Sequence, residues 1–314
     1  MKFLQFDSGE HDTERILLFA TDSGLDDIKR SKNWAVDGTF KCSPIIYYQL
    51  FTLHIQDNGI SVPRLFALLP NKTEDTYNKL FTKLKELVDN VEPDTVMVDF
   101  EKAVINSILN TFRNSDVASC LFHLSQNIYK QVIQIGLKHR YNNDDDFSLK
   151  VRRLSTLAFL PIDDVSEAFE ELTDDDDFPQ ELVSYFESYY IGGVRGRGQR
   201  TRRVESVFPI QLWNVHASTE NGMPHTNNHI EGFHNALKAS VTNVHPNIWS
   251  LITALKNEEA LSTTRIAHRN RGDSVTSKKK YRELDQRVKR LLEQYDPSNK
   301  LQYLRGVAHN LKQY

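Results

Sequence analysis

The sequence predicts an α/β protein in which a mixed five-stranded sheet carries helices on its faces. Three observations indicate this class. Segments rich in β-branched and aromatic residues fill most of residues 34–69. Short apolar runs then alternate with helix-spaced apolar residues from residue 73 onward. Beyond about residue 148 the strand signal fades and helical patterns dominate. A meander followed by strand–helix units gives a mixed sheet.

The first three strands are predicted to form an antiparallel meander. They occupy residues 34–40, 45–55 and 61–69. The dipeptide Asn58-Gly59 between the last two strands is a strong hairpin signal. Pro63 removes a backbone donor from the third strand, so this strand is expected at a sheet edge or with an irregular start.

Strand–helix units are predicted to follow the meander. Thr73 is the expected N-cap of the first helix, and acidic residues after it suit the first helical turn. Residues 95–100, TVMVDF, form an almost unbroken apolar run, which suits a strand covered on both faces. A helix over about 101–112, a strand over 117–122 and a helix beginning with HLSQ complete this region.

Composition excludes several classes of protein. The chain has 314 residues, of which 39% are hydrophobic and 26% charged, so it is long and apolar enough for a sizeable core. No apolar run approaches the length of about 18 residues needed to cross a membrane, and the first residues lack the pattern of a signal peptide. Cys42 and Cys120 are the only cysteines, which fits a reducing compartment.

Charge is distributed unevenly although the net charge is only -3. Residues 142–147 and 173–178 are acidic, whereas residues 195–203 and 277–290 are basic. Such runs are commonly solvated loops and helix faces, and basic runs also suit contacts with phosphate groups. The candidate phosphate-contacting residues are Arg195, Arg197, Arg200, Arg202, Arg203, Lys278, Lys279 and Lys280.

Two acidic residues occupy unusual places in the predicted sheet. Asp37 interrupts the first strand, and Asp99 ends the apolar strand over 95–100. Asp37 alternatively begins an Asp-Gly turn, and Asp99 alternatively caps the following helix. If the two strands are neighbours, however, both carboxylates face one point, and a divalent cation would relieve their repulsion. A third carboxylate from a helix would complete a two-metal site for phosphodiester chemistry.

Several motifs together resemble one known family. They are WAVDGTFKCSP, QLFTLHI, FALLPNKTEDTY, MVDFEKA, CLFHLSQNIYK, LAFLP, FPIQLWNV and TNNHIEGFH. These segments resemble the transposase domain of Mutator-like elements, from about residue 15 to about residue 262. The resemblance implies a ribonuclease-H-like fold and an Asp-Asp-Glu triad made of Asp37, Asp99 and Glu231.

The resemblance also implies a division of the chain. Residues 1–147 would hold the strands and first helices of the core, and residues 148–220 an all-α insertion. Residues 221–270 would carry the helix with Glu231, and residues 271–314 a basic helical extension.

Histidine and cysteine residues add two further candidates. His234 follows Glu231 by three residues and shares its helix face, so it is expected either to assist the acid or to have a structural role. Cys120 and His123 form the Cys-x-x-His arrangement of this superfamily and offer two zinc ligands. The remaining ligands would come from His216, His225, His229 or His234. Alternatively, Cys120 is a buried apolar residue and His123 a hydrogen-bonding one.

The resemblance implies metal-dependent cleavage and transfer of DNA strands, with Mg²⁺ or Mn²⁺ as cofactor. The expected partners are double-stranded DNA, as terminal inverted repeats and as target, and further copies of the chain; no membrane is involved, and the expected location is the nucleus. Family members usually carry a separate DNA-binding module, which this chain is expected to lack. Two alternatives are a domesticated, non-catalytic DNA-binding or regulatory protein and a simple nuclease of the same fold.

Overall fold

The computed structural model describes residues 2–57, 60–174, 177–195, 202–221, 228–241, 245–271 and 279–311. The chain divides into two compact units. The first, called the sheet unit, comprises Met1–Val117 and Asn227–Thr276. The second, called the helical unit, comprises Ala118–Thr226 and Ser277–Tyr314.

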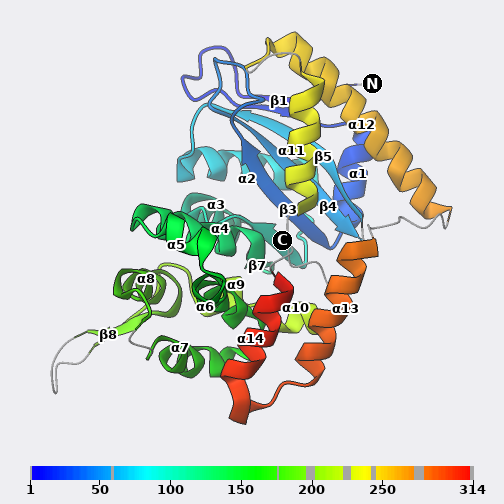
Figure 1. The fold of residues 1–314 in the computed structure, drawn as a ribbon. Helices are drawn as coiled ribbons and strands as arrows, with labels where there is room; N and C mark the ends of the chain where they lie inside the picture. Colours follow the sequence, from blue (N-terminus) through cyan, green and yellow to red (C-terminus); the bar gives the residue numbers. More distant parts are fainter. Residues whose placement is uncertain are drawn as a thin grey trace. The chain divides into compact units, whose positions relative to one another are not determined.

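The sheet unit is built around a mixed sheet, shown in Figure 1, that has seven strands in the described residues. The strands are β1 (Leu4–Asp7), β2 (Leu17–Phe19), β3 (Asn33–Thr39), β4 (Gln49–Asp57), β5 (Ile60–Leu69), β6 (Thr95–Val98) and β7 (Asp116–Ser119). The helices of this unit are α1 (Asp22–Arg30), α2 (Glu74–Leu87), α3 (Lys102–Thr111), α11 (Asn228–Ser240) and α12 (Ile248–Asn270).

The strands lie in the order β1-β2-β5-β4-β3-β6-β7. Strands β3, β4 and β5 form the predicted antiparallel meander, and β6 pairs with β3 in parallel. The predicted α/β class and mixed sheet are therefore confirmed, but the prediction of five strands is wrong. The two extra strands, β1 and β2, extend the β5 edge and have only 4 and 3 residues. Such short strands show too little alternation to be recognised from sequence.

The hairpin between β4 and β5 is confirmed by the pairing of Asp57 with Ile60; Asn58 and Gly59 themselves lie outside the described residues. Pro63 does not mark an edge strand, because β5 lies between β2 and β4. The alternative, an irregular strand, holds instead. Pro63 pairs with His54 where the β4–β5 register shifts, and β2 pairs only with residues 66–68 of β5. The missing N–H of Pro63 therefore falls where the sheet does not require it.

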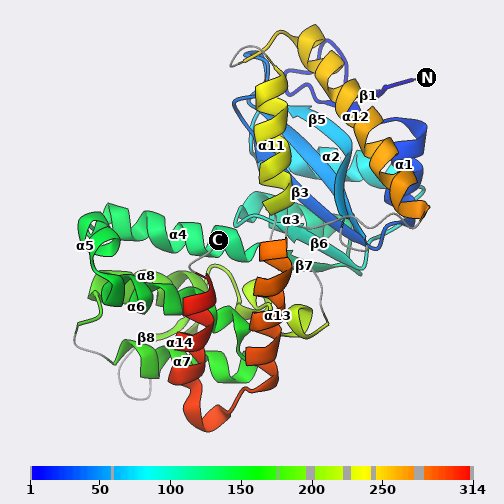
Figure 2. The same ribbon diagram turned by 45° about the vertical axis from the view of Figure 1, so that its right-hand side comes forward.

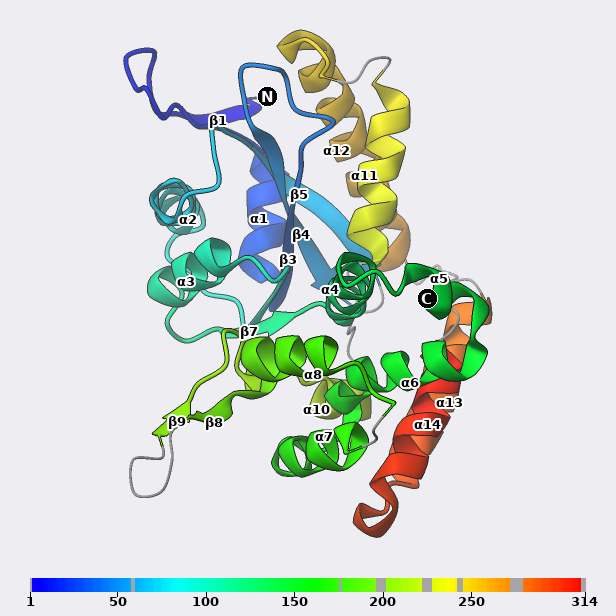
Figure 3. The same cartoon turned by 60° about the vertical axis from the view of Figure 1, so that its left-hand side comes forward.

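Helices cover both faces of the sheet, as Figure 3 shows, with α2 and α3 on one side and α11 and α12 on the other. Helix α2 begins as predicted, because the Thr73 hydroxyl accepts a hydrogen bond from the Thr76 amide at 3.3 Å. Phe51 of β4 contacts Tyr77 and Phe81 of α2, whereas Phe66 of β5 contacts Phe233 of α11. Side-chain alternation along the strands thus separates two apolar layers.

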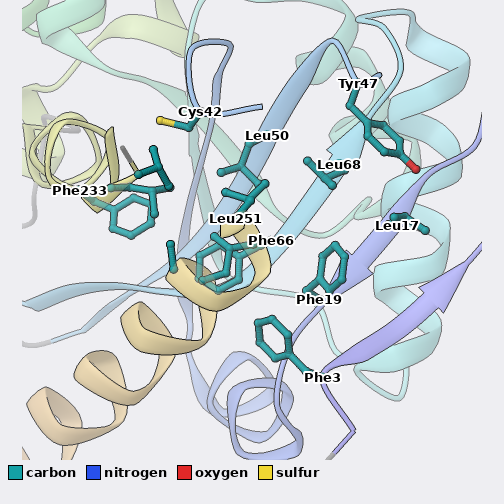
Figure 4. Close-up of a cluster of buried hydrophobic side chains, with 14 residues drawn as sticks. Phe3, Leu17, Phe19, Cys42, Tyr47, Leu50, Phe66, Leu68, Phe233 and Leu251 are labelled. Atoms are coloured by element: carbon teal, nitrogen blue, oxygen red, sulfur yellow. The ribbon is translucent and has the colours of Figure 1, made fainter. Parts of the chain in front are cut away.

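One buried apolar cluster fixes α11 and α12 against the sheet (Figure 4). It joins Leu50, Phe66 and Leu68 of the strands to Phe233 and Leu237 of α11, and all five side chains are buried. Burial of a side chain of this size stabilises the fold by about 1.5–3 kcal/mol. The position of α11 is therefore set mainly by apolar packing.

A buried ion cluster makes a second connection between α12 and the rest of the sheet unit. Arg64 of β5 is fully buried and pairs with Asp27 of α1 at 2.6 Å and with Glu259 of α12 at 2.9 Å. The same guanidinium donates to Thr263 at 3.1 Å, and Thr21 donates to Glu259. Burial raises the pKa of Glu259, and the bonds from Thr21 and Arg64 oppose that rise. One buried arginine thus compensates the carboxylates of buried Glu259 and half-buried Asp27, which lie on different helices.

The helical unit holds most of the remaining elements (Figure 2). Its helices are α4 (Leu121–Gln134), α5 (Lys138–Asn143), α6 (Asp145–Thr156), α7 (Val165–Thr173), α8 (Gln180–Phe186), α9 (Ile210–Trp213), α10 (His216–Glu220), α13 (Lys279–Glu293) and α14 (Lys300–Leu311). Helices α6 and α14 pack side by side. None of the helices within the described ranges is long and apolar enough to span a membrane.

The prediction that residues 148–220 are all α-helical is wrong in one place. A π-helix, Glu187–Ile191, ends at Gly192, and a two-stranded sheet of β8 (Gly193–Arg195) and β9 (Arg202–Val204) follows. Gly192 has a φ of 83°, and a Cβ there would lie 2.7 Å from the Val204 carbonyl oxygen. Glycine therefore permits the chain to leave the helix and pair with β9.

We expect Arg64→Leu to lower the free energy of unfolding by about 3–5 kcal/mol, because buried Glu259 would lose its cation and Asp27 would be left with the exposed Arg30. Urea denaturation would measure the loss. Arg30→Leu is the matched control, since Arg30 also pairs with Asp27 but is 74% exposed; its cost should stay below about 1 kcal/mol. Equal losses for the two variants would contradict this account of the cluster.

Candidate active site

Asp37 lies within β3 and is not part of a turn. It pairs with Thr52 of β4, and Gly38 continues the same pairing with Phe51. The Gly38 amide donates to Asp37 Oδ1 at 2.7 Å. A Cβ at Gly38 would meet the Oε1 of buried Gln49 at 2.3 Å, so only glycine fits after Asp37 without moving that side chain. The turn alternative for Asp37 is therefore excluded.

Asp99 follows the last residue of β6 and lies at the same end of the paired strands as Asp37. The parallel register pairs Ala35 with Met97, and two further residues along each strand place Asp37 beside Asp99. The N-cap of α3 is Glu101, so Asp99 does not cap that helix. The Phe100 amide donates to Asp99 Oδ1 at 2.6 Å, in the same way that Gly38 holds Asp37. The expected neighbourhood of the two strands is confirmed.

Glu231, in the first turn of α11, joins these two acids electrostatically. Burial raises the pKa of Asp37 to about 7, and the charges of Asp99 and Glu231 add to the rise. Burial also raises the pKa of Glu231, with a further contribution from Asp99. The Gly38 amide and Lys72 oppose the rise at Asp37. Three carboxylates from two strands and a helix therefore form one group of coupled negative charges.

The described residues contain no group of three or more His, Cys, Asp or Glu side chains that is already arranged to hold a metal ion. This finding includes the three acids. Their oxygens are nevertheless the ligand type that Mg²⁺ and Mn²⁺ prefer, and their mutual repulsion is what a divalent cation would relieve. Binding of such ions would require the carboxylates to approach one another.

His234 lies one turn after Glu231 on α11 and contacts Asp37. Its Nδ1 lies 3.5 Å from Asp37 Oδ2, and its Nε2 lies 3.3 Å from the Thr52 hydroxyl. Thr52 donates to the Asp37 carbonyl oxygen at 3.3 Å, and His54 Nε2 lies 3.2 Å from the same hydroxyl. Thr52 and His54 are fully buried. A polar chain of four residues thus runs from Asp37 into the sheet beneath α11.

The Thr52 hydroxyl is the common hydrogen-bonding partner in this chain. The Asp37 carbonyl oxygen and the His234 Nε2 atom each lie 3.3 Å from it, and the His54 Nε2 atom lies 3.2 Å from it. Burial raises the pKa of Asp37 to about 7 and lowers the pKa of His234 to about 4. Both shifts favour the uncharged forms of the two contacting side chains.

The positive charge of Lys72 acts to lower the pKa of Asp37 and so opposes the rise that burial causes. Its Nζ pairs with Glu101 at 2.7 Å, and Glu101 also accepts a hydrogen bond from the Tyr77 hydroxyl at 2.8 Å. Gln49 donates to that hydroxyl at 2.8 Å. These bonds hold Lys72 near the acids but share its charge with Glu101.

Cys120 and His123 are both buried, at the N-cap and in the first turn of α4. Within the ranges that the structure describes, no third His, Cys, Asp or Glu joins them in a group that could hold a metal. Of the other candidate ligands, His225 lies outside the described residues, His229 is exposed on α11, and His216 opens α10. The zinc site stays a prediction.

The two basic runs are described only in part. Arg195, Arg202 and Arg203 lie on β8 and β9, where Arg195 pairs with Arg202. Lys279 and Lys280 open α13. Arg197, Arg200 and Lys278 fall outside the described residues.

The fold and these residues define an α/β protein in which three electrostatically coupled acids lie near the C-terminal ends of two inner strands. Residues 33–127 match the family model of the MULE transposase domain, and the resemblance to Mutator-like transposases is confirmed over this segment. Asp37 and Asp99 lie within the match, whereas Glu231 lies beyond it. No curated protein matches the chain.

The sequence motifs indicated no role for Thr52, His54 or Lys72. A signal for the first two was present, because Thr52 and His54 are polar residues two apart in the otherwise apolar run LFTLHI and therefore share one face of the strand. Lys72 follows β5 in the segment PNKTED, and nothing in its spacing points to Asp37.

The raised pKa of Asp37 predicts how stability depends on pH in the absence of metal. An acid that is harder to ionise in the folded state destabilises that state progressively as pH rises from its unfolded value, about 4, to about 7. Asp37→Asn removes this effect. Between about pH 5 and about pH 8, the stability of the variant relative to wild type should rise by about 2–3 kcal/mol.

Urea unfolding in EDTA at several pH values would measure this difference. Because other titrating groups are common to both proteins, their effects largely cancel in the comparison. A difference that does not change with pH would show that the pKa of the Asp37 carboxyl is not raised in the folded protein.

Proposed function

We propose that this chain is a DNA transposase that cleaves and transfers DNA strands through Asp37, Asp99 and Glu231. The observation that carries the proposal is the grouping of these three carboxylates: Asp37 and Asp99 lie side by side on and after two paired strands, and their charges are coupled to that of Glu231. Two of them lie within the match to the MULE transposase domain. Strongly shifted pKa values such as that of Asp37 cluster at functional sites.

The order of the inner strands supports a ribonuclease-H-like core. Counted from β3, the strands β5-β4-β3-β6-β7 have the order 3-2-1-4-5, with an antiparallel meander and a parallel fourth strand. In this arrangement the ends of β3 and β6 bring the two aspartates together, and the helix α11 delivers Glu231.

The proposed cofactor is a pair of Mg²⁺ or Mn²⁺ ions held by the three carboxylates. Such ions supply an activated water or hydroxyl nucleophile and stabilise the leaving oxygen of a phosphodiester. The donor set fits, because it consists of hard oxygen ligands, and burial together with mutual repulsion raises the pKa of Asp37 and Glu231.

The remaining residues of the site would position these ligands. The Gly38 and Phe100 amides each donate a hydrogen bond to one oxygen of the preceding aspartate and so fix its carboxyl group. His234, which is held in place by Thr52, would orient the Asp37 carboxyl group through its contact with Oδ2. Lys72 adds one positive charge beside the acids, suited to a phosphate oxygen.

The proposed partner is double-stranded DNA, as element ends and as target, bound by a homo-oligomer in the nucleus. The arginines of β8 and β9 and the lysines that open α13 are proposed to contact the phosphate backbone, which gives affinity without sequence reading. A separate DNA-binding module would supply recognition of the element ends.

Metal binding can be tested without any DNA substrate. Mn²⁺ at about ten times its Kd should stabilise the wild type by about 1.4 kcal/mol. Asp37→Asn should show little of this stabilisation, although it is the more stable protein without metal. Thermal unfolding at pH 8, with and without Mn²⁺, would measure both effects. Equal stabilisation of the two proteins would place the metal elsewhere.

Catalysis can be tested by nicking of, and strand transfer into, supercoiled plasmid in Mn²⁺. We expect wild type to be active and Asp99→Asn and Glu231→Gln to fall to background while their DNA binding persists. A folded, DNA-binding but inactive wild type would favour the alternative, a domesticated DNA-binding protein.

His234→Asn should lower the nicking rate by about 10- to 100-fold, because neighbours that orient a metal ligand typically have effects of this size. Its half-saturating Mn²⁺ concentration should rise as well. His229→Asn, on the exposed side of the same helix, is the matched control and should leave both quantities unchanged. An effect on stability alone would reduce His234 to a structural role.

A further inference from the structure

The loop between β3 and β4, residues 40–48, presents two isoleucines to solvent. Ile45 is 85% exposed and Ile46 is 70% exposed. They are the two central residues of a β-turn, closed by the Tyr47 amide donating to the Pro44 carbonyl at 2.9 Å. Central turn positions usually carry Gly, Asn, Asp, Pro or Ser, because β-branched residues gain nothing there. The pair of isoleucines is therefore not explained by local backbone preference.

The turn is held firmly from beneath. Pro44 and Tyr47 on either side of the isoleucines are buried, and so are Cys42 and Ser43. The Ser43 hydroxyl donates to the Tyr47 carbonyl at 3.1 Å. Cys42 and Tyr47 also belong to the apolar cluster of Figure 4. Folding thus fixes a rigid support and leaves two apolar side chains projecting from it.

Aromatic and basic groups accompany the isoleucines on this loop. Phe40 and Tyr48 are 40% and 53% exposed, and their rings meet edge to face with centroids 5.3 Å apart. The Lys72 ammonium lies 4.7 Å from the centre of the Phe40 ring. Lys41 is exposed on the same loop. Apolar tips, aromatic rings and lysines together are the chemistry that contacts stacked bases between phosphates.

The loop also follows the end of β3 near which the acids lie. Strand β3 runs through Asp37 and enters the loop three residues later, and the neighbouring strand β6 ends at Val98, immediately before Asp99. Lys72 links the two features, because it contacts Phe40 of the loop and its charge acts on Asp37. A DNA duplex bound at the acids would therefore pass close to the turn.

We propose that Ile45 and Ile46 form an apolar wedge that enters between stacked bases of the DNA duplex bound at the acids. The wedge unstacks a base step and bends or opens the duplex near the cleaved phosphodiester. This inference rests on the proposed function, and it adds a base-contacting element that the three carboxylates do not supply. The aromatic pair Phe40 and Tyr48 would receive the face of a displaced base.

A second copy of the chain is the other occupant to consider for this surface. Stable protein interfaces use about 20–30 residues on each side. The exposed apolar groups of the loop number only four, Phe40, Ile45, Ile46 and Tyr48, and lysines border them. This patch suits insertion into a narrow step better than coverage by a flat protein surface.

The wedge can be tested without knowing the DNA sequence that the chain recognises. The probes are two fluorescent duplexes of about 30 base pairs and identical sequence, one fully paired and one with a central two-base mismatch. A wedge enters an already unstacked step at lower cost, so wild type should bind the mismatched duplex about three- to tenfold more tightly. Ile45→Ser/Ile46→Ser should lose this preference and keep its affinity for the paired duplex within about threefold, because phosphate contacts dominate that affinity. Fluorescence anisotropy in EDTA would measure both.

Controls separate the wedge from general surface effects. Ile45→Leu/Ile46→Leu should keep the mismatch preference, and so should Leu109→Ser, which removes an exposed apolar side chain (48%) from α3. Loss of preference in the leucine variant, or no preference in wild type, would overturn the proposal. So would a serine variant that keeps the preference but dissociates a wild-type dimer in sedimentation velocity, since the surface would then bind a second copy.

Failure of the wedge and failure of the proposed function give different results. Plasmid nicking in Mn²⁺ tests the acids, whereas the mismatch preference is measured in EDTA and needs no chemistry. An active wild type whose serine variant binds both duplexes as wild type does would remove the wedge and leave the transposase proposal intact.

Discussion

The apolar packing of α11 against the sheet is the interaction on which the site depends, because it holds three partly buried carboxylates together against the cost of burial and mutual repulsion. Asp37 and Asp99 cannot separate, because each lies on one of two paired parallel strands and each is held by the amide that follows it. Glu231 cannot withdraw without moving α11, which is fixed by Phe233 and Leu237 in the apolar cluster. Folding free energy from apolar packing thus offsets an electrostatic arrangement that is unfavourable by itself.

Two groups of buried charge in this unit illustrate opposite designs. Around Arg64, one cation meets two carboxylates within hydrogen-bonding distance, and the cluster joins three elements. Around Asp37, Lys72 is the cation that counters the acids, and Glu101 shares its charge. The first group is complete in the protein alone and stabilises the position of α12. In the second, burial and the charges of the other two acids raise the pKa of Asp37, and such shifts are common at functional sites.

Much of the sheet could be predicted from sequence because its strands carry strong signals. The apolar run before Asp99, the Asn-Gly hairpin and the Thr73 cap are local features, and each predicted its element correctly. Strands β1 and β2 were missed because 4 and 3 residues show little pattern, and only the pairing of β2 with the distant strand β5 joins them to the rest of the sheet. The pair Asp37 and Asp99 could be predicted once their strands were taken as neighbours. The contacts of His234 with Thr52 could not, since they depend on how α11 packs on β4.

The sheet unit is discontinuous, because residues 118–226 of the helical unit separate its two segments. During synthesis, β3 to β6 therefore emerge well before the helix that carries Glu231. The strand face that holds Phe66 and Leu68 lacks its cover of α11 over this interval, so completion of the core awaits residues far along the chain. A chain released early would carry both aspartates but not the glutamate, and truncated products would be unable to assemble the full set of acids.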